Sequence, residues 1–371
     1  MSLVVLTNIP TPYRTAFFDA VATEATRIGR GFHVLYCATT EPGRHWPYEP
    51  AAMRHPHTVL GGWHPRLAGT TAHLNLGILA ALRDLRPTTL LVAGAWNTPT
   101  MLMAGWSDVP CRRIFWSEGH ADAVLHPHGF VAWARRRAYR TYDAFAVPNG
   151  RSAAWACAQA GEAKPIVDLP NAIDTEFYRP ATPEQKTAAR RQLGLPATGR
   201  VLVQVGALTE RKGPLPLARA FLAMAPAERR DAVLVLVGTG PQEAALQALA
   251  ASSEGTLRPL GQRDPAGVRE VLHAADTFVL NTFLDPNPLS PIEAAACGLP
   301  LLLSVKSGNS DELITGAGLG SPITDPADPA AALRTALGWS DSERAMFATR
   351  ARQAVESAFS APAIARRLIR E

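Results

Sequence analysis

The stretch VLVQVGALTERKGPLPLARAFLA at residues 201–223 has the order strand, loop, helix. Its first part, Val201–Gly206, is an apolar run that ends in glycine, and an amphipathic helical pattern follows the loop. Uniformly apolar strands are typical of parallel sheets that helices cover on both faces. Such sheets bind phosphates at the carboxyl ends of their strands. The basic pair Arg211-Lys212 in this loop is therefore a candidate phosphate contact, with a solvated surface turn as the alternative.

The same alternation of strand and helix extends outward in both directions from this stretch. Short apolar runs predict further strands at Leu3–Thr7, Phe32–Cys37, Thr89–Ala95, Arg113–Trp116, Ala144–Pro148, Ala232–Gly238, Thr277–Asn281 and Leu299–Leu303. Helical patterns lie between them, and the last stretch, Asp341–Glu371, also has a helical pattern with arginine-rich faces. The alternation restarts near Val201 after a proline-rich stretch, and 371 residues are too many for one ordinary core. We therefore expect two doubly wound Rossmann-like domains in tandem, with a cleft between them.

Composition excludes several classes of protein. Hydrophobic residues make up 47% and charged residues 19% of the chain, which is the range of globular proteins and not of disordered ones. No apolar run has the length of a membrane-spanning helix, and the first residues lack the basic region of a signal peptide. The four cysteines form no CxxC pair, so neither a zinc knuckle nor a disulfide scaffold is expected. We expect a cytoplasmic protein.

Charge is distributed unevenly between the two halves. Residues 1–172 contain 16 basic and 11 acidic residues, which accounts for the whole net charge of +5, and they also contain nine of the ten histidines. A basic first half predicts an anionic partner, such as a phosphorylated small molecule, a lipid surface or a nucleic acid. The chain has no recognisable nucleic-acid-binding motif, so nucleic acid is the least favoured of the three.

A second candidate site lies at FLDPNPLSPIEAAACGLP, residues 283–300. Asp285 precedes a predicted helix start, and Glu293 follows eight residues later among small apolar side chains. The prolines nearby suit a loop and a first helical turn, whose amides form an anion site. Each carboxylate alone is explained as a loop cap or a solvent-facing helix position, but together beside such a helix end they indicate a site.

These motifs resemble, in order, those of the retaining glycosyltransferases of the GT-B fold, in the glycogen-synthase-like or group 1 branch. The resemblance covers nearly the whole second half. It is carried by PNAIDTEFYRP (170–180), VGALTERKG (205–213), VGTGP (237–241), ADTFVL (275–280), the Asp285–Glu293 pair, and EAAACGLP (293–300). Two departures are Ala207, where the family has arginine, and Pro288, where it has glycine. Lys212 is therefore left as the matched diphosphate contact, and we infer that Arg211 supplies the missing cation.

The resemblance implies a residue role for each matched position. The donor, a nucleotide sugar of the UDP or GDP type, is expected to contact Gly206, Arg211, Lys212, Glu293 and the amides of Leu289 and Ser290. Glu293 would bind the ribose hydroxyls, and Lys212 the diphosphate. Asp285 and His120 are the expected catalytic residues, because their counterparts hold the donor sugar. A surface loop position is the alternative for His120.

The resemblance also implies a domain assignment and a reaction. Residues 1–172 would bind the acceptor and residues 173–371 the donor, with the final helix packing back on the first domain. The expected activity is a metal-independent, hexosyltransferase-type transfer with retention, and no cofactor is expected. The alternatives are a GT-B nucleotide-sugar epimerase and a catalytically degenerate donor-binding partner subunit.

Acceptor candidates come from the loops after two strands of the first half. Tyr13 and Arg14 follow the first strand, and Trp96 and Asn97 follow another. Given the basic first half, we expect an anionic acceptor, such as a glycan or lipid-linked glycolipid precursor. The stretch Phe130–Arg140 combines aromatic and basic residues, so Arg14 and the Arg135–Arg140 cluster are candidate contacts to this acceptor or to an anionic inner membrane face. The alternative for this stretch is an ordinary sheet-covering helix with a solvated arginine face.

Overall fold

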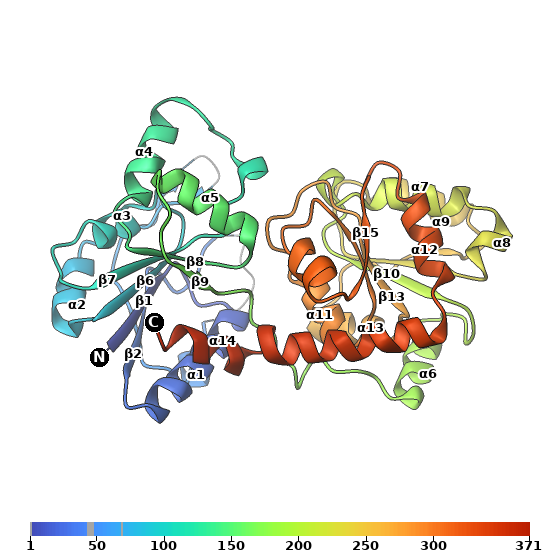
Figure 1. Ribbon diagram of the computed structural model, residues 1–371, viewed down its shortest axis with the longest axis horizontal. Helices are drawn as coiled ribbons and strands as arrows, with labels where there is room; N and C mark the ends of the chain where they lie inside the picture. Colours follow the sequence, from blue (N-terminus) through green and yellow to red (C-terminus); the bar gives the residue numbers. More distant parts are fainter. Residues whose placement is uncertain (1, 43–47, 68–69) are drawn as a thin grey trace. The chain divides into compact units, whose positions relative to one another are not determined.

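The computed structural model describes residues 2–42, 48–67 and 70–371, and it divides into two compact units (Figure 1). The first unit comprises Met1–Ala172 together with Ser360–Glu371, and the second comprises Ile173–Phe359. Each unit is built on one parallel sheet with helices on both faces. The α/β class with two parallel sheets, predicted from the sequence, is confirmed.

The first unit has a seven-stranded sheet in the order β3-β2-β1-β6-β7-β8-β9. All six strand pairs are parallel. The strands are β1 (Ser2–Thr7), β2 (Gly31–Tyr36), β3 (His57–Val59), β6 (Thr89–Ala93), β7 (Arg112–Trp116), β8 (Ala144–Val147) and β9 (Ile166–Asp168). A separate two-stranded ribbon pairs β4 (Arg66–Leu67) with β5 (Thr70–Thr71).

Helices cover both faces of this sheet because its central strands are apolar on both faces. Along β1, Leu3 and Val5 point into one buried cluster, and Val4 and Leu6 point into the other. The first cluster is closed by α1 (Pro12–Arg27) and α14 (Ala361–Leu368), and the second by α2 (Ile78–Leu85), α3 (Pro99–Gly105) and α5 (Gly150–Ala160). Further helical segments are η1 (Pro50–Ala52), η2 (Ala121–Ala123) and α4 (Gly129–Tyr139).

The second unit has a six-stranded parallel sheet in the order β12-β11-β10-β13-β14-β15. The strands are β10 (Val201–Val205), β11 (Val233–Val237), β12 (Leu257–Pro259), β13 (Thr277–Leu280), β14 (Leu301–Ser304) and β15 (Gly320–Ile323). The helical segments are α6 (Pro183–Gln192), η3 (Glu210–Lys212), α7 (Pro214–Ala223), α8 (Pro226–Arg229), α9 (Glu243–Ala251), α10 (Pro265–Ala274), α11 (Ser290–Ala296), η4 (Asp311–Gly316), α12 (Ala330–Gly338), α13 (Asp341–Ala354) and η5 (Val355–Phe359).

Each sheet has one point where the strand order reverses direction. In the second unit this point lies between β10 and β13, and in the first it lies between β1 and β6. In open α/β sheets the loops at such a point diverge to opposite faces and leave a crevice outside the carboxyl ends of the strands. The predicted donor loops follow β10 and β13, and the predicted acceptor loops follow β1 and β6, so the topology places each set at such a point.

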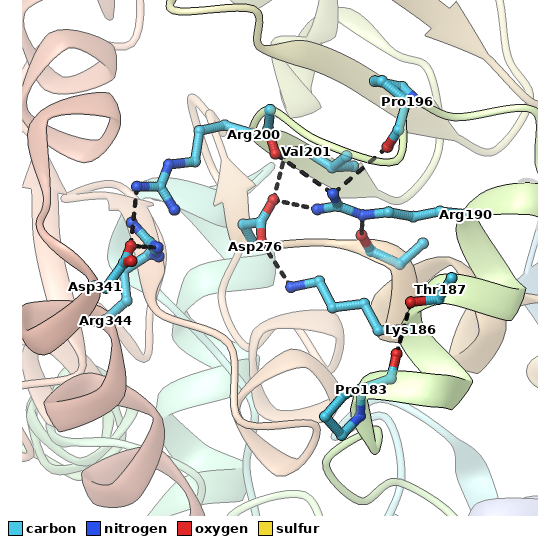
Figure 2. Close-up of polar contacts among 12 residues, drawn as sticks. Pro183, Lys186, Thr187, Arg190, Pro196, Arg200, Val201, Asp276, Asp341 and Arg344 are labelled. Atoms are coloured by element: carbon cyan, nitrogen blue, oxygen red, sulfur yellow. Dashed lines mark hydrogen bonds and ion pairs between the residues drawn. The ribbon is translucent and has the colours of Figure 1, made fainter.

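A buried ion-pair network fixes the opposite, amino-terminal edge of the second sheet (Figure 2). The Asp276 carboxylate accepts hydrogen bonds from Lys186 Nζ at 2.6 Å, from an Arg190 guanidinium nitrogen at 2.6 Å and from the Val201 amide at 2.7 Å. Arg190 Nε also donates to the carbonyl of Ala274 at 3.0 Å. Because Val201 begins β10 and Asp276 directly precedes β13, one carboxylate joins α6 to the two central strands.

The predicted helix over Asp341–Glu371 is interrupted in the structure. The chain passes from α13 through the π-helical turn η5 and begins again at α14, in the first unit. The Ser360 side chain caps α14 by accepting from the Ala363 amide, and Pro362 occupies the first turn of that helix. A capping serine and a proline in the first turn are both typical of a helix N-terminus and are unfavourable in a helix interior. The helical pattern predicted for this stretch is therefore confirmed, and the structure divides it into α13, η5 and α14.

Candidate functional site

The basic loop after β10 and the acidic loop after β13 meet in the second unit. Lys212 Nζ forms an ion pair with Asp285 Oδ2, and both side chains are nearly buried. An Arg211 guanidinium nitrogen lies 3.9 Å from Asp285 Oδ1 and donates to the Leu284 carbonyl at 2.6 Å. The Arg211 side chain is half exposed. Two cations and one carboxylate that the sequence predicted as site residues therefore lie together at the carboxyl edge of the sheet.

Three polar side chains hold the backbone of this basic loop, one on each of three successive carbonyls. Thr282 Oγ1 donates to the Arg211 carbonyl at 2.9 Å, and Gln204 Nε2 donates to the Lys212 carbonyl at 3.0 Å. Asn281 Nδ2 donates to the Gly213 carbonyl at 3.1 Å. All three side chains are buried, so water does not compete for these hydrogen bonds. The bonds therefore fix the loop backbone and the direction in which the Lys212 side chain points.

Glycine is required at the end of the loop for two reasons. Gly213 has φ +60°, a left-handed conformation, and a Cβ atom there would lie 2.0 Å from the Asn281 carbonyl oxygen. The loop can therefore lie directly against the end of β13 only with glycine at this position. Sequence reasoning identified the glycine but missed Gln204, Asn281 and Thr282; a glutamine inside the apolar strand VLVQV was the available signal.

The Asp285 loop is fastened to the segment that follows β14. The Asp285 amide donates to the Lys306 carbonyl at 3.3 Å, and the Gly308 amide donates to the Asp285 carbonyl at 2.7 Å. Asn309 Nδ2 donates to the Pro288 carbonyl at 2.9 Å. A Cβ atom on Gly308 would lie 1.8 Å from the Pro286 carbonyl oxygen, so this segment also packs against the loop. The sequence analysis missed it, although the small polar run SGNS at 307–310 follows a buried strand.

The remaining donor-side candidates lie on either side of this ion pair. The first amides that donate within α11 are those of Ile292 and Glu293, both to the Leu289 carbonyl, so the amides of Leu289 and Ser290 precede the hydrogen-bonded ladder. Gly206 has φ +153°, and a Cβ atom there would lie 3.8 Å from Lys212 Cε. The side chain of Lys212 therefore runs past Gly206 on its way to Asp285.

Glu293 lies on α11 with a different set of partners. Burial raises the pKa of its carboxyl group to about 7, and a hydrogen bond with the Tyr178 side chain opposes this shift. Burial and the nearby Glu293 charge raise the pKa of Tyr178 in turn. No hydrogen bond or ion pair within the described residues joins Glu293 to the Lys212–Asp285 pair. Sequence reasoning did not identify Tyr178 as the partner of this carboxyl group.

In the first unit, Arg14 is held by its surroundings. One guanidinium nitrogen donates to Thr7 Oγ1 at 3.0 Å, and another lies 3.9 Å from Glu118. The guanidinium carbon stands 4.7 Å from the centre of the Trp116 ring. Arg14 thus joins the end of β1 to the end of β7. The side chain of its predicted neighbour Tyr13 lies outside the described part of the chain.

The other candidates of the first unit follow β6 and β7. Trp96 is half-buried against the cluster beneath α2 and α3, and Asn97 is exposed. His120 is buried and caps η2, because its Nδ1 atom accepts from the Asp122 amide at 3.2 Å. Since β1, β6 and β7 are neighbours in the sheet, Arg14, the Trp96-Asn97 pair and His120 all belong to one edge of it.

His55 and His73 of the first unit are buried and hydrogen-bonded to neighbouring side chains. His55 is buried between Asp19, at 2.7 Å, and the Tyr36 hydroxyl, at 2.9 Å. His73 lies between Glu41, at 2.9 Å, and His64, at 3.0 Å. Burial lowers the pKa of both His55 and His64, which favours their neutral forms. The histidine count therefore overstates the exposed basic surface of the first unit, since His55 and His73 are buried, although His126 and His128 are exposed. The anionic partner stays a prediction.

Arg135 also differs from its predicted role. Its side chain is buried, with Nε donating to Gln159 Oε1 at 2.8 Å and another nitrogen donating to the His126 carbonyl at 3.2 Å. It packs over the ring of Trp155. The predicted Arg135–Arg140 cluster is therefore not one surface, because Arg135 belongs to the face of α4 that packs on α5.

Among the described residues, no group of three or more His, Cys, Asp or Glu side chains is arranged to hold a metal ion.

Comparison with known proteins agrees with this architecture. Residues 185–354, nearly the whole second unit, match the family of glycosyl transferases group 1. A GDP-mannose-dependent monoacylated alpha-(1-6)-phosphatidylinositol monomannoside mannosyltransferase of Corynebacterium glutamicum is 35% identical over 156 residues, which is 40% of each chain. The alpha-maltose-1-phosphate synthase of Mycolicibacterium smegmatis is 26% identical over 71% of this chain and 70% of its own length. The chain spans about two fifths of the length of the first curated relatives it matches.

Two solved structures show the same fold along the whole chain. Alr3699/HepE of Anabaena, crystallised with UDP, has a TM-score of 0.75 at 16% identity and covers 100% of this chain and 99% of its own. WaaG, a glycosyltransferase involved in lipopolysaccharide biosynthesis, has a TM-score of 0.66 at 18% identity, with 99% of both chains covered. The chain therefore has the GT-B fold, and its residues 185–354 match the group 1 glycosyl transferases.

Proposed function

We propose that the protein is a retaining glycosyltransferase that moves a hexose from a nucleotide-sugar donor to an acceptor. The observation that carries this proposal is the meeting of Arg211, Lys212 and Asp285 beside the first turn of α11, where the strand order of the second sheet reverses. Such a crevice suits a nucleotide, and the two cations suit its diphosphate.

The roles of the two cations follow from the charge that develops during the reaction, and the other roles are those that the family resemblance implies. When the sugar leaves, negative charge builds on the diphosphate, so Lys212 and Arg211 stabilise the transition state more than the bound donor. The amides of Leu289 and Ser290 add to this stabilisation. Asp285, freed from Lys212 by the arriving diphosphate, accepts hydrogen bonds from the hydroxyls of the donor sugar. Glu293 accepts those of the ribose, and His120 of the first unit contacts the donor sugar. In this scheme protein groups supply the positive charge, so the transfer is metal-independent.

The first unit binds the acceptor in this proposal. Its excess of basic over acidic residues favours an anionic acceptor, with Arg14, Tyr13, Trp96 and Asn97 as the residues that surround it. The names of related proteins support a glycolipid or glycan precursor, because one acts on a phosphatidylinositol mannoside and another belongs to lipopolysaccharide biosynthesis. A GDP- or UDP-type donor agrees with the GDP-mannose of the first and with the UDP bound to Alr3699/HepE. The cytoplasm is the compartment where such donors and acceptors meet.

The test begins with a panel of nucleotide sugars and free nucleoside diphosphates, scored by thermal stabilisation of the protein. The donor found is then incubated with the protein, and nucleoside diphosphate release and the anomeric configuration of the product are measured. We expect stabilisation by one donor type, slow hydrolysis without acceptor, and retention in the product. Stabilisation by none of the panel, or inversion in the product, would contradict the proposal.

Ala207 and Pro288 give a specific reason to consider a donor-binding partner subunit without activity of its own. They remove one family cation and one loop amide from the site. Donor binding with no hydrolysis and no transfer would favour this second candidate. Interconversion of the bound nucleotide sugar with its epimer, in the absence of an acceptor, would favour an epimerase instead.

A further inference from the structure

An exposed apolar surface marks the beginning of α4 and the loop before it. We call it the α4 tip and define it by four side chains with their exposed fractions: Leu125 (88%), Phe130 (77%), Trp133 (57%) and Val131 (38%). The rings of Phe130 and Trp133 stack on each other, with centroids 5.5 Å apart. Isolated apolar side chains are common on protein surfaces, but two stacked aromatic rings that are both more than half exposed indicate an interaction site.

The opposite face of α4 explains why Phe130 and Trp133 point away from the core of the first unit. Ala132, Arg135, Ala138 and Tyr139 are buried, and they occupy the face that packs on the first unit. The hydrogen bonds of Arg135 to Gln159 and to the His126 carbonyl fix the rotation of the helix. Phe130 and Trp133 lie about half a turn of the helical wheel away from this face, so they point to solvent by the geometry of the helix.

Positive charge lies directly behind the α4 tip. Residues 123–142 contain four arginines and no acidic residue. Arg136 and Arg137 are exposed, and no ion pair of either side chain occurs within the described part of the chain. Arg137 follows Trp133 by one helical turn, a rise of about 6 Å. The apolar side chains lie at the beginning of α4 and the exposed arginines about one turn later. This order suits a membrane surface, where the acyl chains lie below the layer of lipid phosphates.

We propose that the α4 tip docks on an anionic lipid bilayer. Leu125, Phe130 and Trp133 enter the boundary between headgroups and acyl chains, while Arg136 and Arg137 bind lipid phosphates. The combination of an exposed aromatic pair with arginines that have no ion pair among the described residues favours a lipid surface over a protein partner. In the described residues no helix has both the length and the hydropathy to cross a membrane, so this contact is a peripheral one. It needs no donor and is independent of the proposed transferase activity.

The experiment is co-sedimentation of the full chain with vesicles of phosphatidylcholine mixed with phosphatidylglycerol, and with vesicles of phosphatidylcholine alone. The Phe130→Ser/Trp133→Ser variant is expected to bind the anionic vesicles about tenfold more weakly or worse, because two aromatic side chains no longer leave water. Its matched control is Trp106→Ser, which removes an equally exposed tryptophan elsewhere on the first unit.

A second pair of variants separates charge from apolar burial. Arg136→Gln/Arg137→Gln is expected to weaken binding by on the order of tenfold at low salt and by less at high salt. Arg191→Gln/Arg219→Gln makes the same change of charge at exposed positions of the second unit and is expected to bind like the unmodified protein. Because all these side chains are exposed, unchanged thermal unfolding will show that the variants fold.

Three results would overturn the proposal. One is equal vesicle binding by Phe130→Ser/Trp133→Ser and Trp106→Ser. Another is binding by the unmodified protein that does not distinguish anionic from neutral vesicles. The third is a change of oligomeric state in the Phe130→Ser/Trp133→Ser variant without any effect on vesicle binding, which would make the α4 tip a contact between copies of the chain. Donor-induced thermal stabilisation, measured in parallel, reports separately on the transferase proposal.

Discussion

The Nζ atom of Lys212 and the Oδ2 atom of Asp285 form a nearly buried ion pair across the carboxyl ends of β10 and β13. The two residues are proposed to contact different parts of the donor, the diphosphate and the sugar. In the described state each is instead the partner of the other. Donor binding must therefore replace one ion pair by two new sets of contacts, so the pair keeps both charges satisfied until the donor arrives.

Lys212→Ala is expected to lower kcat and raise the donor KM, because the lost charge acts most strongly on the departing diphosphate. The expected loss of transition-state stabilisation is about 2–4 kcal/mol. Steady-state kinetics at several donor concentrations measure it. Kinetics identical to the unmodified enzyme would place Lys212 outside the site.

The coupling between Lys212 and Asp285 is measured by a double-mutant cycle. Lys212→Ala leaves Asp285 with only its longer ion pair to Arg211, and Asp285→Asn leaves Lys212 as a nearly buried charge without its carboxylate partner. We therefore expect Lys212→Ala/Asp285→Asn to be less unstable than the two single effects predict. Urea unfolding of the four proteins without donor gives the coupling free energy. Strict additivity would show that the ion pair contributes nothing to the donor-free protein.

The raised pKa of Glu293, from its ordinary 4.5 to about 7, makes stability depend on pH. The folded state binds the proton more tightly than the unfolded chain, so this contribution is complete below about pH 4.5 and is lost as the pH rises through about 7. Relative to Glu293→Gln, the unmodified protein should therefore lose about 1–3 kcal/mol of unfolding free energy across this window. A constant difference between the two proteins would contradict the raised pKa.

Nucleotide affinity should also depend on the ionisation of Glu293, but it should rise with pH where the stability falls. If the Glu293 carboxylate accepts the ribose hydroxyls, the affinity ratio between the unmodified protein and Glu293→Gln rises between about pH 6 and pH 8. Taking this ratio cancels the titration of the nucleotide itself. Tyr178→Phe, which removes the hydrogen bond that opposes the shift, should move the rise to higher pH. Calorimetric titrations of nucleoside diphosphate measure all three proteins.

Gln204→Leu tests whether the basic loop needs its backbone support. The change keeps the volume but leaves the Lys212 carbonyl without the bond from Gln204, at a stability cost of about 1–3 kcal/mol. We expect a higher donor KM, because Lys212 is less firmly directed, while the acceptor KM stays constant. Gln204→Asn, which retains an amide, should recover part of the donor affinity. Equal effects on donor and acceptor would assign Gln204 a role in folding alone.

Asp276→Ala should destabilise the second unit without changing its chemistry. Removing the carboxylate leaves Arg190 buried without its partner, a loss of about 3–5 kcal/mol. The network lies at the edge of the sheet opposite to Lys212, so kcat per folded molecule should be unchanged. Denaturant unfolding and activity at low temperature measure the two quantities. A fall in kcat at a temperature where the variant is fully folded would contradict this separation.

The sequence predicted the central strands better than the edge strands. β1, β6, β10, β11 and β13 are mainly apolar because helices cover both of their faces, and Gln204 is a buried polar exception in β10. The edge strands β3, β9, β12 and β15 are only three or four residues long and include polar residues, proline and glycine, so their sequences contain no comparable run. They become strands because a neighbouring strand offers its unpaired edge.

The candidate site was predictable at positions where a charged side chain lies in a loop that is typical of a binding site. Arg211, Lys212 and Asp285 were identified from charge in glycine- and proline-rich loops, and the structure brings them together. The supporting bonds of Asn281 and of the 306–309 segment depend on long-range packing, which no local pattern contains. The same reason explains the error at Arg135, whose sequence neighbours are exposed arginines but whose own side chain faces α5.

The position of α14 reverses the order in which the two units are completed during synthesis. Ile364 and Leu368 belong to the buried cluster of the first unit, yet the ribosome adds them only after the whole of Ile173–Phe359. Domains generally fold as units while the chain emerges, beginning with the N-terminal one. Here the second unit is continuous and can close its core while the first unit still has one face of its sheet partly uncovered. During synthesis we therefore expect the nascent first unit to expose apolar surface around Phe17 and Phe18 until α14 arrives.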